Sequence, residues 1–82
     1  MVKVLFDSVF EKQVKKIKDA ALKTKIKKQI GKLIENPELG KPMRYSRKGT
    51  REVYVPPFRL SYHYDKKKQQ LTFLDLYHKD QQ

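Results

Sequence analysis

The sequence of 82 residues contains no cysteine. Disulfides and thiolate-ligated metal sites both require cysteine. Its absence therefore excludes a disulfide scaffold and a cysteine-bound metal. Proteins without disulfides are typical of a reducing compartment, so we expect a cytoplasmic protein.

Long apolar stretches are missing as well. No run approaches the roughly 20 apolar residues that a membrane-spanning helix needs. Residues 1–7 are too few and too mixed in character for a secretory signal peptide. We therefore expect no association with a membrane.

Acidic residues are scarce: 9 Asp and Glu stand against 20 Lys and Arg, which gives a net charge of +11. On a small folded domain this excess attracts a polyanion or an acidic protein. The alternative is a lysine-rich solvated surface, but such surfaces usually carry matching glutamates. With two histidines and no clustered carboxylates, we expect neither a metal nor another cofactor.

The length predicts a single domain, residues 1–82, with one sheet and one or two covering helices. Apolar spacing predicts a strand at 2–6 and helices at 9–18 and 20–35, the helices forming a hairpin. Asp7 and Asp19 are placed to cap the two helices. After a loop at 39–42, further strands are predicted at 43–47, 52–55, 58–64 and 71–79.

This order predicts an α+β fold in which an N-terminal strand and the helical hairpin pack on one face of a mainly antiparallel sheet of four to five strands. The last strand has Leu71 and Phe73 on one face but Leu74 and Leu76 on the other. A strand that is apolar on both faces usually lies inside its sheet, so we expect an interior position.

The central feature is a hairpin over residues 49–64 that turns at Pro56-Pro57. Placing Val53 opposite Leu60 and Tyr54 opposite Arg59 gathers the apolar side chains on one face. The other face then carries the candidate site, formed by Glu52, Tyr54, Arg59 and Ser61.

For the last hairpin, Tyr64 is expected opposite Leu71. The same pairing puts Arg59 opposite Leu76 and brings His78 to the same side as Arg59, while Tyr77 turns to the core face. Glu52, Arg59 and His78 are therefore predicted to converge.

The chain resembles the RelE/ParE superfamily of toxins from toxin–antitoxin pairs, nearer to the RelE and YoeB branch. Four segments in order carry the resemblance across essentially the whole chain: N-P-E-L-G-K-P at 36–42, R-K-G-T-R-E-V at 47–53, F-R-L-S-Y at 58–62 and D-L-Y-H-K-D at 75–80.

The resemblance implies a RelE-like fold and a ribonuclease that enters the ribosomal A site and cuts messenger RNA without a metal. It further implies an acidic, RelB-like antitoxin and a monomeric free toxin. Arg59 corresponds to the arginine that holds the scissile phosphate, and His78, preceded by Tyr77, to the general acid of the YoeB branch. Arg51 lies near a catalytic lysine of the RelE branch.

The sequence also departs from the family pattern. Met43 stands where the YoeB branch has its glutamate base, and the chain ends at Gln82 without the functional tyrosine that follows the last strand in the RelE branch. Glu52 remains a candidate base. Two other functions stay open: a ParE-like inhibitor of DNA gyrase without catalysis, and an inactive basic binding domain.

A basic cluster around the turn before the hairpin suits phosphate contacts, with Tyr45 and Tyr54 available for stacking on bases. Tyr77 is included among the RNA-binding residues on the condition that the end of the last strand twists away from the core face. The structural alternatives are a solvated turn for the cluster, a cross-strand ion pair for Arg59 and Glu52, and a surface histidine for His78. The predicted RNA-binding residues of the cluster are Arg44, Arg47, Lys48 and Arg51.

Overall fold

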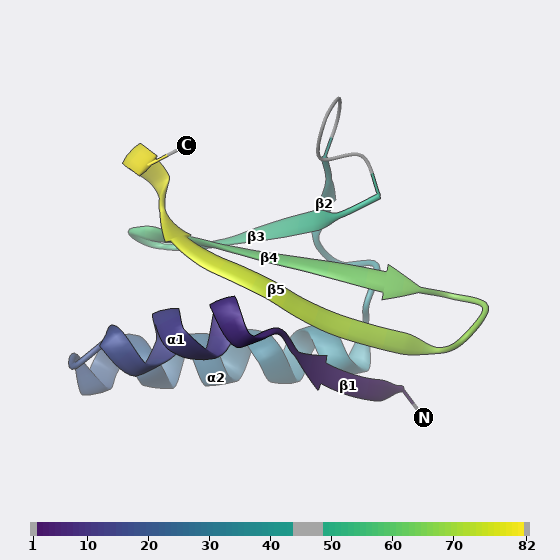
Figure 1. Cartoon of the computed structure of the whole chain (residues 1–82), viewed down its shortest axis with the longest axis horizontal. Helices are drawn as coiled ribbons and strands as arrows, with labels where there is room; N and C mark the ends of the chain where they lie inside the picture. The colour runs from purple at the N-terminus through teal and green to yellow at the C-terminus, as the bar shows by residue number, and fades with distance from the viewer. Residues whose placement is uncertain (1, 44–48, 82) are drawn as a thin grey trace.

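A computed structural model describes residues 2–43 and 49–81. The described elements, in order, are β1 (Lys3–Phe6), α1 (Ser8–Lys16), α2 (Ala20–Glu35), β2 (Lys41–Pro42), β3 (Arg51–Val55), β4 (Phe58–Asp65), β5 (Gln70–His78) and a 3-10 helix (Lys79–Gln81). The five described strands form one sheet in the order β1-β5-β4-β3-β2, with β1 parallel to β5 and the other pairs antiparallel. Figure 1 shows α1 and α2 on the same side of this sheet. The predicted α+β architecture is confirmed.

α2 begins where the sequence predicts, and α1 begins one residue earlier than predicted. The carboxylate of Asp7 accepts a hydrogen bond from the amide of Val9, and Asp19 caps α2 in the same way. α2 has the predicted bounds, whereas α1 ends at Lys16, two residues early. Ile17 is already extended and buried there, because the chain must turn at once into α2. Neither helix is long and apolar enough to cross a membrane.

The core lies between the helices and the covered face of the sheet. Helix residues Phe10, Ile26 and Leu33 are buried against strand residues of β4 and β5, chiefly Leu60, Tyr62, Leu71, Phe73 and Leu76. Burial of each large apolar side chain stabilises the fold by about 1.5–3 kcal/mol. The opposite face of the sheet is left open for the polar side chains.

The β3–β4 hairpin has the predicted register. Val53 pairs with Leu60, and Tyr54 pairs with Arg59. Because successive side chains alternate between faces, Glu52 lies next to Arg59 on the open face. The hairpin therefore places a carboxylate and a guanidinium where the sequence puts them.

The β4–β5 pairing has the predicted register only at the end near the turn that connects the two strands. Tyr64 pairs with Leu71, but a bulge at Leu74 shifts the register beyond Tyr62, so that Arg59 pairs with Tyr77. The predicted pairing of Arg59 with Leu76 is wrong. The bulge inserts one extra residue and thereby lets Leu76 join the core with Leu71, which strict alternation would forbid. β5 does lie inside the sheet, between β1 and β4.

The predicted loop at 39–42 and strand at 43–47 also need correction. The strand β2 already forms at Lys41–Pro42, where Lys41 pairs with Glu52, and Met43 follows it. Positions 44–47 of the predicted strand lie outside the described residues. The sequence misses β2 because distant side chains hold this segment against β3.

Two side chains hold the segment before β2. The buried Tyr62 hydroxyl accepts a hydrogen bond from the amide of Gly40 (2.7 Å) and donates one to the carbonyl of Pro37 (2.8 Å). Burial raises the pKa of Tyr62, so the phenol keeps the proton that it donates. Arg51 adds hydrogen bonds to the carbonyls of Glu38 (3.0 Å) and Gly40 (2.8 Å).

We expect Gly40→Ala to lower the free energy of unfolding by about 1–3 kcal/mol, because it disturbs buried hydrogen bonds. A Cβ at this position would lie 2.5 Å from the Tyr62 hydroxyl oxygen. Gly31→Ala is the matched control: its Cβ meets nothing within 4 Å, and alanine should stabilise the helix interior by about 0.5–1 kcal/mol. Urea denaturation measures both. Equal stability of Gly40→Ala and wild type would show that the Tyr62 contact does not hold this segment.

Candidate functional site

Polar side chains of three neighbouring strands share the face of the sheet that the helices leave open. The alternation along each strand and the observed register place them there. They are Glu52 and Tyr54 from β3, Arg59 and Ser61 from β4, and Asp75 and Tyr77 from β5.

Glu52 is the centre of this group. Its side chain is only 3% exposed, and its Oε2 accepts a hydrogen bond from the Tyr77 hydroxyl. Nη1 of Arg59 lies 4.0 Å from Oε1 of Glu52. A carboxylate, a phenol and a guanidinium thus meet on one face, as the sequence predicts for Glu52 and Arg59 but not for Tyr77.

Arg59 faces an open cleft. Its side chain is 38% exposed, and its guanidinium carbon lies 5.6 Å from the centre of the Tyr54 ring. Its buried Nε has no hydrogen-bond partner among the described residues. The cleft measures about 560 Å³ and is lined by Lys41, Pro42, Met43, Glu52, Val53, Tyr54 and Arg59.

This arrangement suits the binding of a phosphate. A guanidinium presents a planar set of donors to two phosphate oxygens and keeps its charge at neutral pH. Lys41 adds a second cation to the lining, and the half-exposed Tyr54 offers a ring face at the rim. The cleft can therefore hold an anionic group beside the Glu52 carboxylate.

Contrary to the prediction, His78 lies on the opposite face of the sheet from Arg59. The bulge places it opposite Phe58, with the two rings edge to face and their centres 5.7 Å apart. Its Nδ1 accepts a hydrogen bond from the amide of Asp80 (3.2 Å). The prediction that Tyr77 turns to the core face is wrong for the same reason. The uneven spacing of Leu71, Phe73 and Leu76 was the sequence signal for this bulge.

The remaining predicted RNA-binding residues are distributed differently. The Arg51 guanidinium is bound to the carbonyls of Glu38 and Gly40 and does not line the Arg59 cleft. Arg44, Tyr45, Arg47 and Lys48 lie outside the described residues. Tyr54 and Tyr77 both lie at the site.

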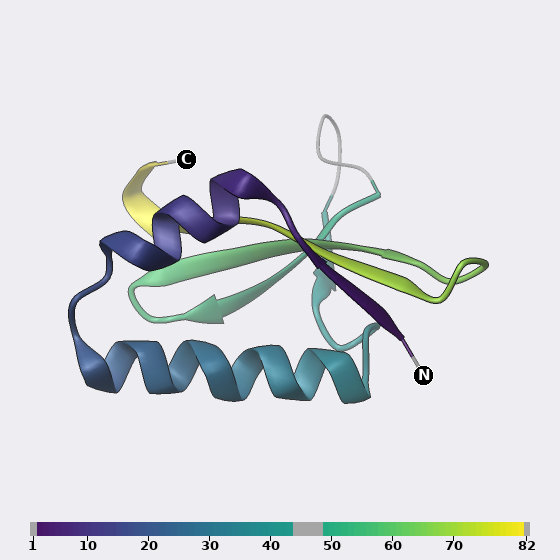
Figure 2. The same ribbon diagram turned by 60° about the horizontal axis from the view of Figure 1, so that its bottom comes forward.

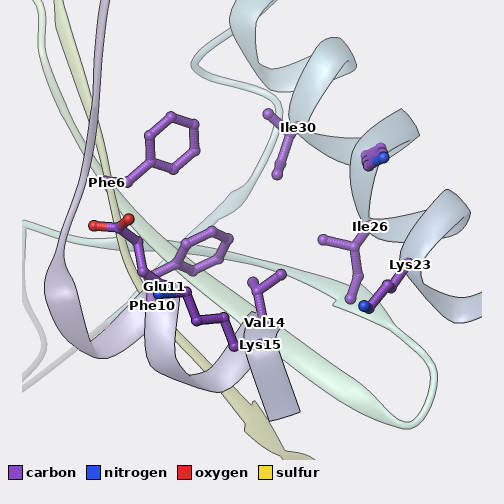
Figure 3. Close-up of a pocket in the computed structure, with 9 residues that line it drawn as sticks. Phe6, Phe10, Glu11, Val14, Lys15, Lys23, Ile26 and Ile30 are labelled. Atoms are coloured by element: carbon purple, nitrogen blue, oxygen red, sulfur yellow. The ribbon is translucent and has the colours of Figure 1, made fainter. Parts of the chain in front are cut away.

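A second hollow, of about 450 Å³, lies between α1 and α2 on the helical side of the molecule. Figure 3 shows the Phe10, Val14, Ile26 and Ile30 side chains directed into this groove. Phe6 contributes to the lining and is 47% exposed as a residue. The charged residues of its lining are Glu11, Lys15, Lys23 and Lys27, so the groove combines an apolar floor with a mainly basic rim.

The sequence matches the family described as the ParE toxin of type II toxin–antitoxin systems, parDE, over residues 4–82. It matches none of the curated proteins with which it was compared.

Solved structures share the fold. The toxin–antitoxin complex RelBE2 from Mycobacterium tuberculosis aligns with a TM-score of 0.80 at 24% identity, covering 95% of this chain and 98% of the other. The YoeB/ParE toxin from Agrobacterium tumefaciens aligns at 0.83 and 17% identity, covering 94% and 98%. YafQ from Escherichia coli aligns at 0.79 and 23% identity, covering 98% and 96%. At these identities the likeness shows a common fold, and it confirms the RelE-like architecture.

Proposed function

This chain belongs to the ParE toxin family of type II toxin–antitoxin systems, and we propose that within this family it acts by cleaving messenger RNA on the ribosome. The observation that carries the proposal is Arg59, an exposed guanidinium in an open cleft next to the Glu52 carboxylate and the Tyr77 hydroxyl. The net charge of +11 supports a polyanionic target. Solved relatives of the same fold include RelE and YafQ toxins.

In the proposed reaction, the 2′-hydroxyl of the RNA attacks the adjacent phosphorus. The bond from O2′ to phosphorus forms as the bond to O5′ breaks, and negative charge grows on the phosphate oxygens. Arg59 stabilises this charge through hydrogen bonds that strengthen toward the transition state. Its contact with Glu52 is long, at 4.0 Å, and Arg59 lines the cleft, so its donors remain available to a phosphate bound there.

The proton transfer is assigned to Glu52 and Tyr77. The Glu52 carboxylate takes the proton of the 2′-hydroxyl, and the Tyr77 hydroxyl protonates the leaving O5′. Tyr77 then regains a proton from Glu52 through the hydrogen bond that joins them. The family resemblance assigns the acid to His78, but Tyr77 is better placed because His78 lies beside Phe58.

The groove between α1 and α2 supports an antitoxin as the second partner. Its apolar floor fits one face of an amphipathic segment, and Lys15, Lys23 and Lys27 fit acidic side chains along that segment. The RelBE complex of Escherichia coli and the YoeB–YefM complex of Staphylococcus aureus share this fold. We propose that an acidic antitoxin binds here.

Inhibition of DNA gyrase is the second candidate. It is favoured by the description of the matching family as ParE and by the position of His78 away from the cleft. A gyrase inhibitor needs a binding surface but no proton donor, so the Glu52–Tyr77 pair would then only stabilise the fold.

Brief induction of the wild-type chain separates the two candidates. We expect new messenger RNA 5′ ends inside translated codons, with plasmid supercoiling unchanged. Loss of supercoiling with intact messages would favour gyrase inhibition instead. Growth arrest alone does not distinguish the candidates, so both readouts are taken from the same culture.

A further inference from the structure

The lysines of α2 form two separate rows. Lys23 and Lys27 line the apolar groove against α1. The second row, Lys25, Lys28 and Lys32, lines a different hollow of about 230 Å³ on the side toward β3. Spacings of three and four residues put the second row on one face of the helix. One helix thus presents positive charge to two different surfaces.

The second row is connected to the candidate site through Tyr54. This residue lines both the Arg59 cleft and the hollow beside α2, where Val55 and Pro56 are its neighbours. Tyr54 is 48% exposed as a residue. Figure 2 shows α2 running along the edge of the fold beside β3. Arg59, Tyr54 and the second lysine row therefore follow one another across the surface.

The charge of this row is uncompensated by its neighbours. α2 carries Glu35 at its end as its single acidic residue. None of the three lysines forms an ion pair within the described ranges 2–43 and 49–81. The row spans roughly 10 Å along the helix at 1.5 Å per residue, a length that suits successive phosphates rather than a single small anion.

We propose that Lys25, Lys28 and Lys32, together with Tyr54, bind the backbone of the single-stranded RNA whose scissile phosphate Arg59 holds. Tyr54 supplies a ring for base stacking between the cleft and the helix, and the lysines follow the flanking phosphates. A basic track interrupted by an aromatic side chain is the usual arrangement for binding single strands. The inference rests on the proposed ribonuclease function and specifies the path of its substrate.

Binding of a short 2′-O-methyl RNA tests the path, because this probe has no free 2′-hydroxyl and stays intact. Fluorescence anisotropy over a range of salt concentrations gives the affinity and its salt dependence. We expect the triple variant Lys25→Gln, Lys28→Gln, Lys32→Gln to bind more than tenfold more weakly at low salt. The slope of log affinity against log salt concentration should be smaller in magnitude by about 2, since each of the three lost phosphate contacts contributes about 0.7 to it.

The matched control removes the same charge elsewhere. Lys66, Lys67 and Lys68 lie in the turn between β4 and β5, at the other end of the molecule from the β3–β4 turn (Figure 1). Their triple replacement by glutamine should change affinity only a few-fold and leave the salt slope unchanged. Tyr54→Leu should weaken binding about tenfold without changing the slope.

Equal losses in the two triple variants would overturn the proposal and leave only a general electrostatic attraction. An α2 variant that binds RNA normally but no longer binds an antitoxin would also overturn it and assign the row to a protein. If the wild type binds the probe through these lysines but cuts no message in cells, the path stands and the ribonuclease function fails.

Discussion

Replacing Arg59 with alanine is expected to lower the rate of messenger RNA cleavage about 10²–10³-fold and to relieve growth arrest on induction. The loss of one donor that stabilises transition-state charge typically has an effect of this size. The fold should survive, because the Arg59 side chain is 38% exposed and its 4.0 Å contact with Glu52 is long. We expect the free energy of unfolding to fall by about 1–3 kcal/mol, because the buried Glu52 carboxylate loses its nearby cation but keeps the hydrogen bond from Tyr77. Mapping of 5′ ends measures the first effect and thermal unfolding the second.

Two further variants make this result specific. Arg59→Lys keeps the charge but loses the planar pair of donors, so its cleavage rate should lie between wild type and alanine. Lys66→Ala removes one positive charge from the distant turn and should cut messages at the wild-type rate. A well-folded Arg59→Ala protein that cleaves normally would remove Arg59 from the mechanism, whereas a large loss of stability would support a structural ion pair with Glu52.

The sequence predicted those parts of the molecule that local chemistry determines. Asp7 and Asp19 cap helices through their own neighbours, and alternation alone sets the register that brings Tyr54 opposite Arg59. Helix capping and strand alternation act within a few residues or across one tight hairpin, so both can be predicted without knowing the rest of the fold.

The features that sequence reasoning missed depend on distant contacts. The bulge at Leu74 arises because Leu76 is buried in the core between the sheet and the helices. As a result, Tyr77 lies on the open face and His78 on the core face, the reverse of the prediction. The strand β2 forms because Tyr62 holds the segment that precedes it. One inserted residue in β5 therefore changes the chemistry available at the site while the fold class stays as predicted.

The open and the helical faces of the molecule are chemically distinct. The open face has Arg59 beside a carboxylate and a phenol, and the helical face has an apolar groove with a basic rim. An antitoxin segment in the groove would lie across the sheet from Arg59. Neutralisation would then require the antitoxin to extend beyond the groove or to prevent the toxin from entering the ribosome.

The corrected register leads to an expected reversal of roles between two adjacent residues. We expect Tyr77→Phe to lower the cleavage rate about 10²–10⁴-fold, because it removes the hydroxyl that is bound to Glu52 and is positioned as the proton donor. His78→Ala should stay within a few-fold of wild type, because the histidine ring lies against Phe58 and not in the cleft. Single-turnover cleavage of ribosome-bound messenger RNA compares the two.

The contrast between these variants separates chemistry from folding. Tyr77→Phe also takes one donor from the buried Glu52 carboxylate, which should lower the free energy of unfolding by about 1–3 kcal/mol. Assays are therefore made well below the midpoint of thermal unfolding of the variant. If the Tyr77 hydroxyl is the proton donor, the cleavage rate of Tyr77→Phe should be lowered even when all of the variant protein is folded. A fully folded Tyr77→Phe protein with normal cleavage, beside an inactive His78→Ala protein, would return the acid to His78 and require the end of β5 to rearrange on the ribosome.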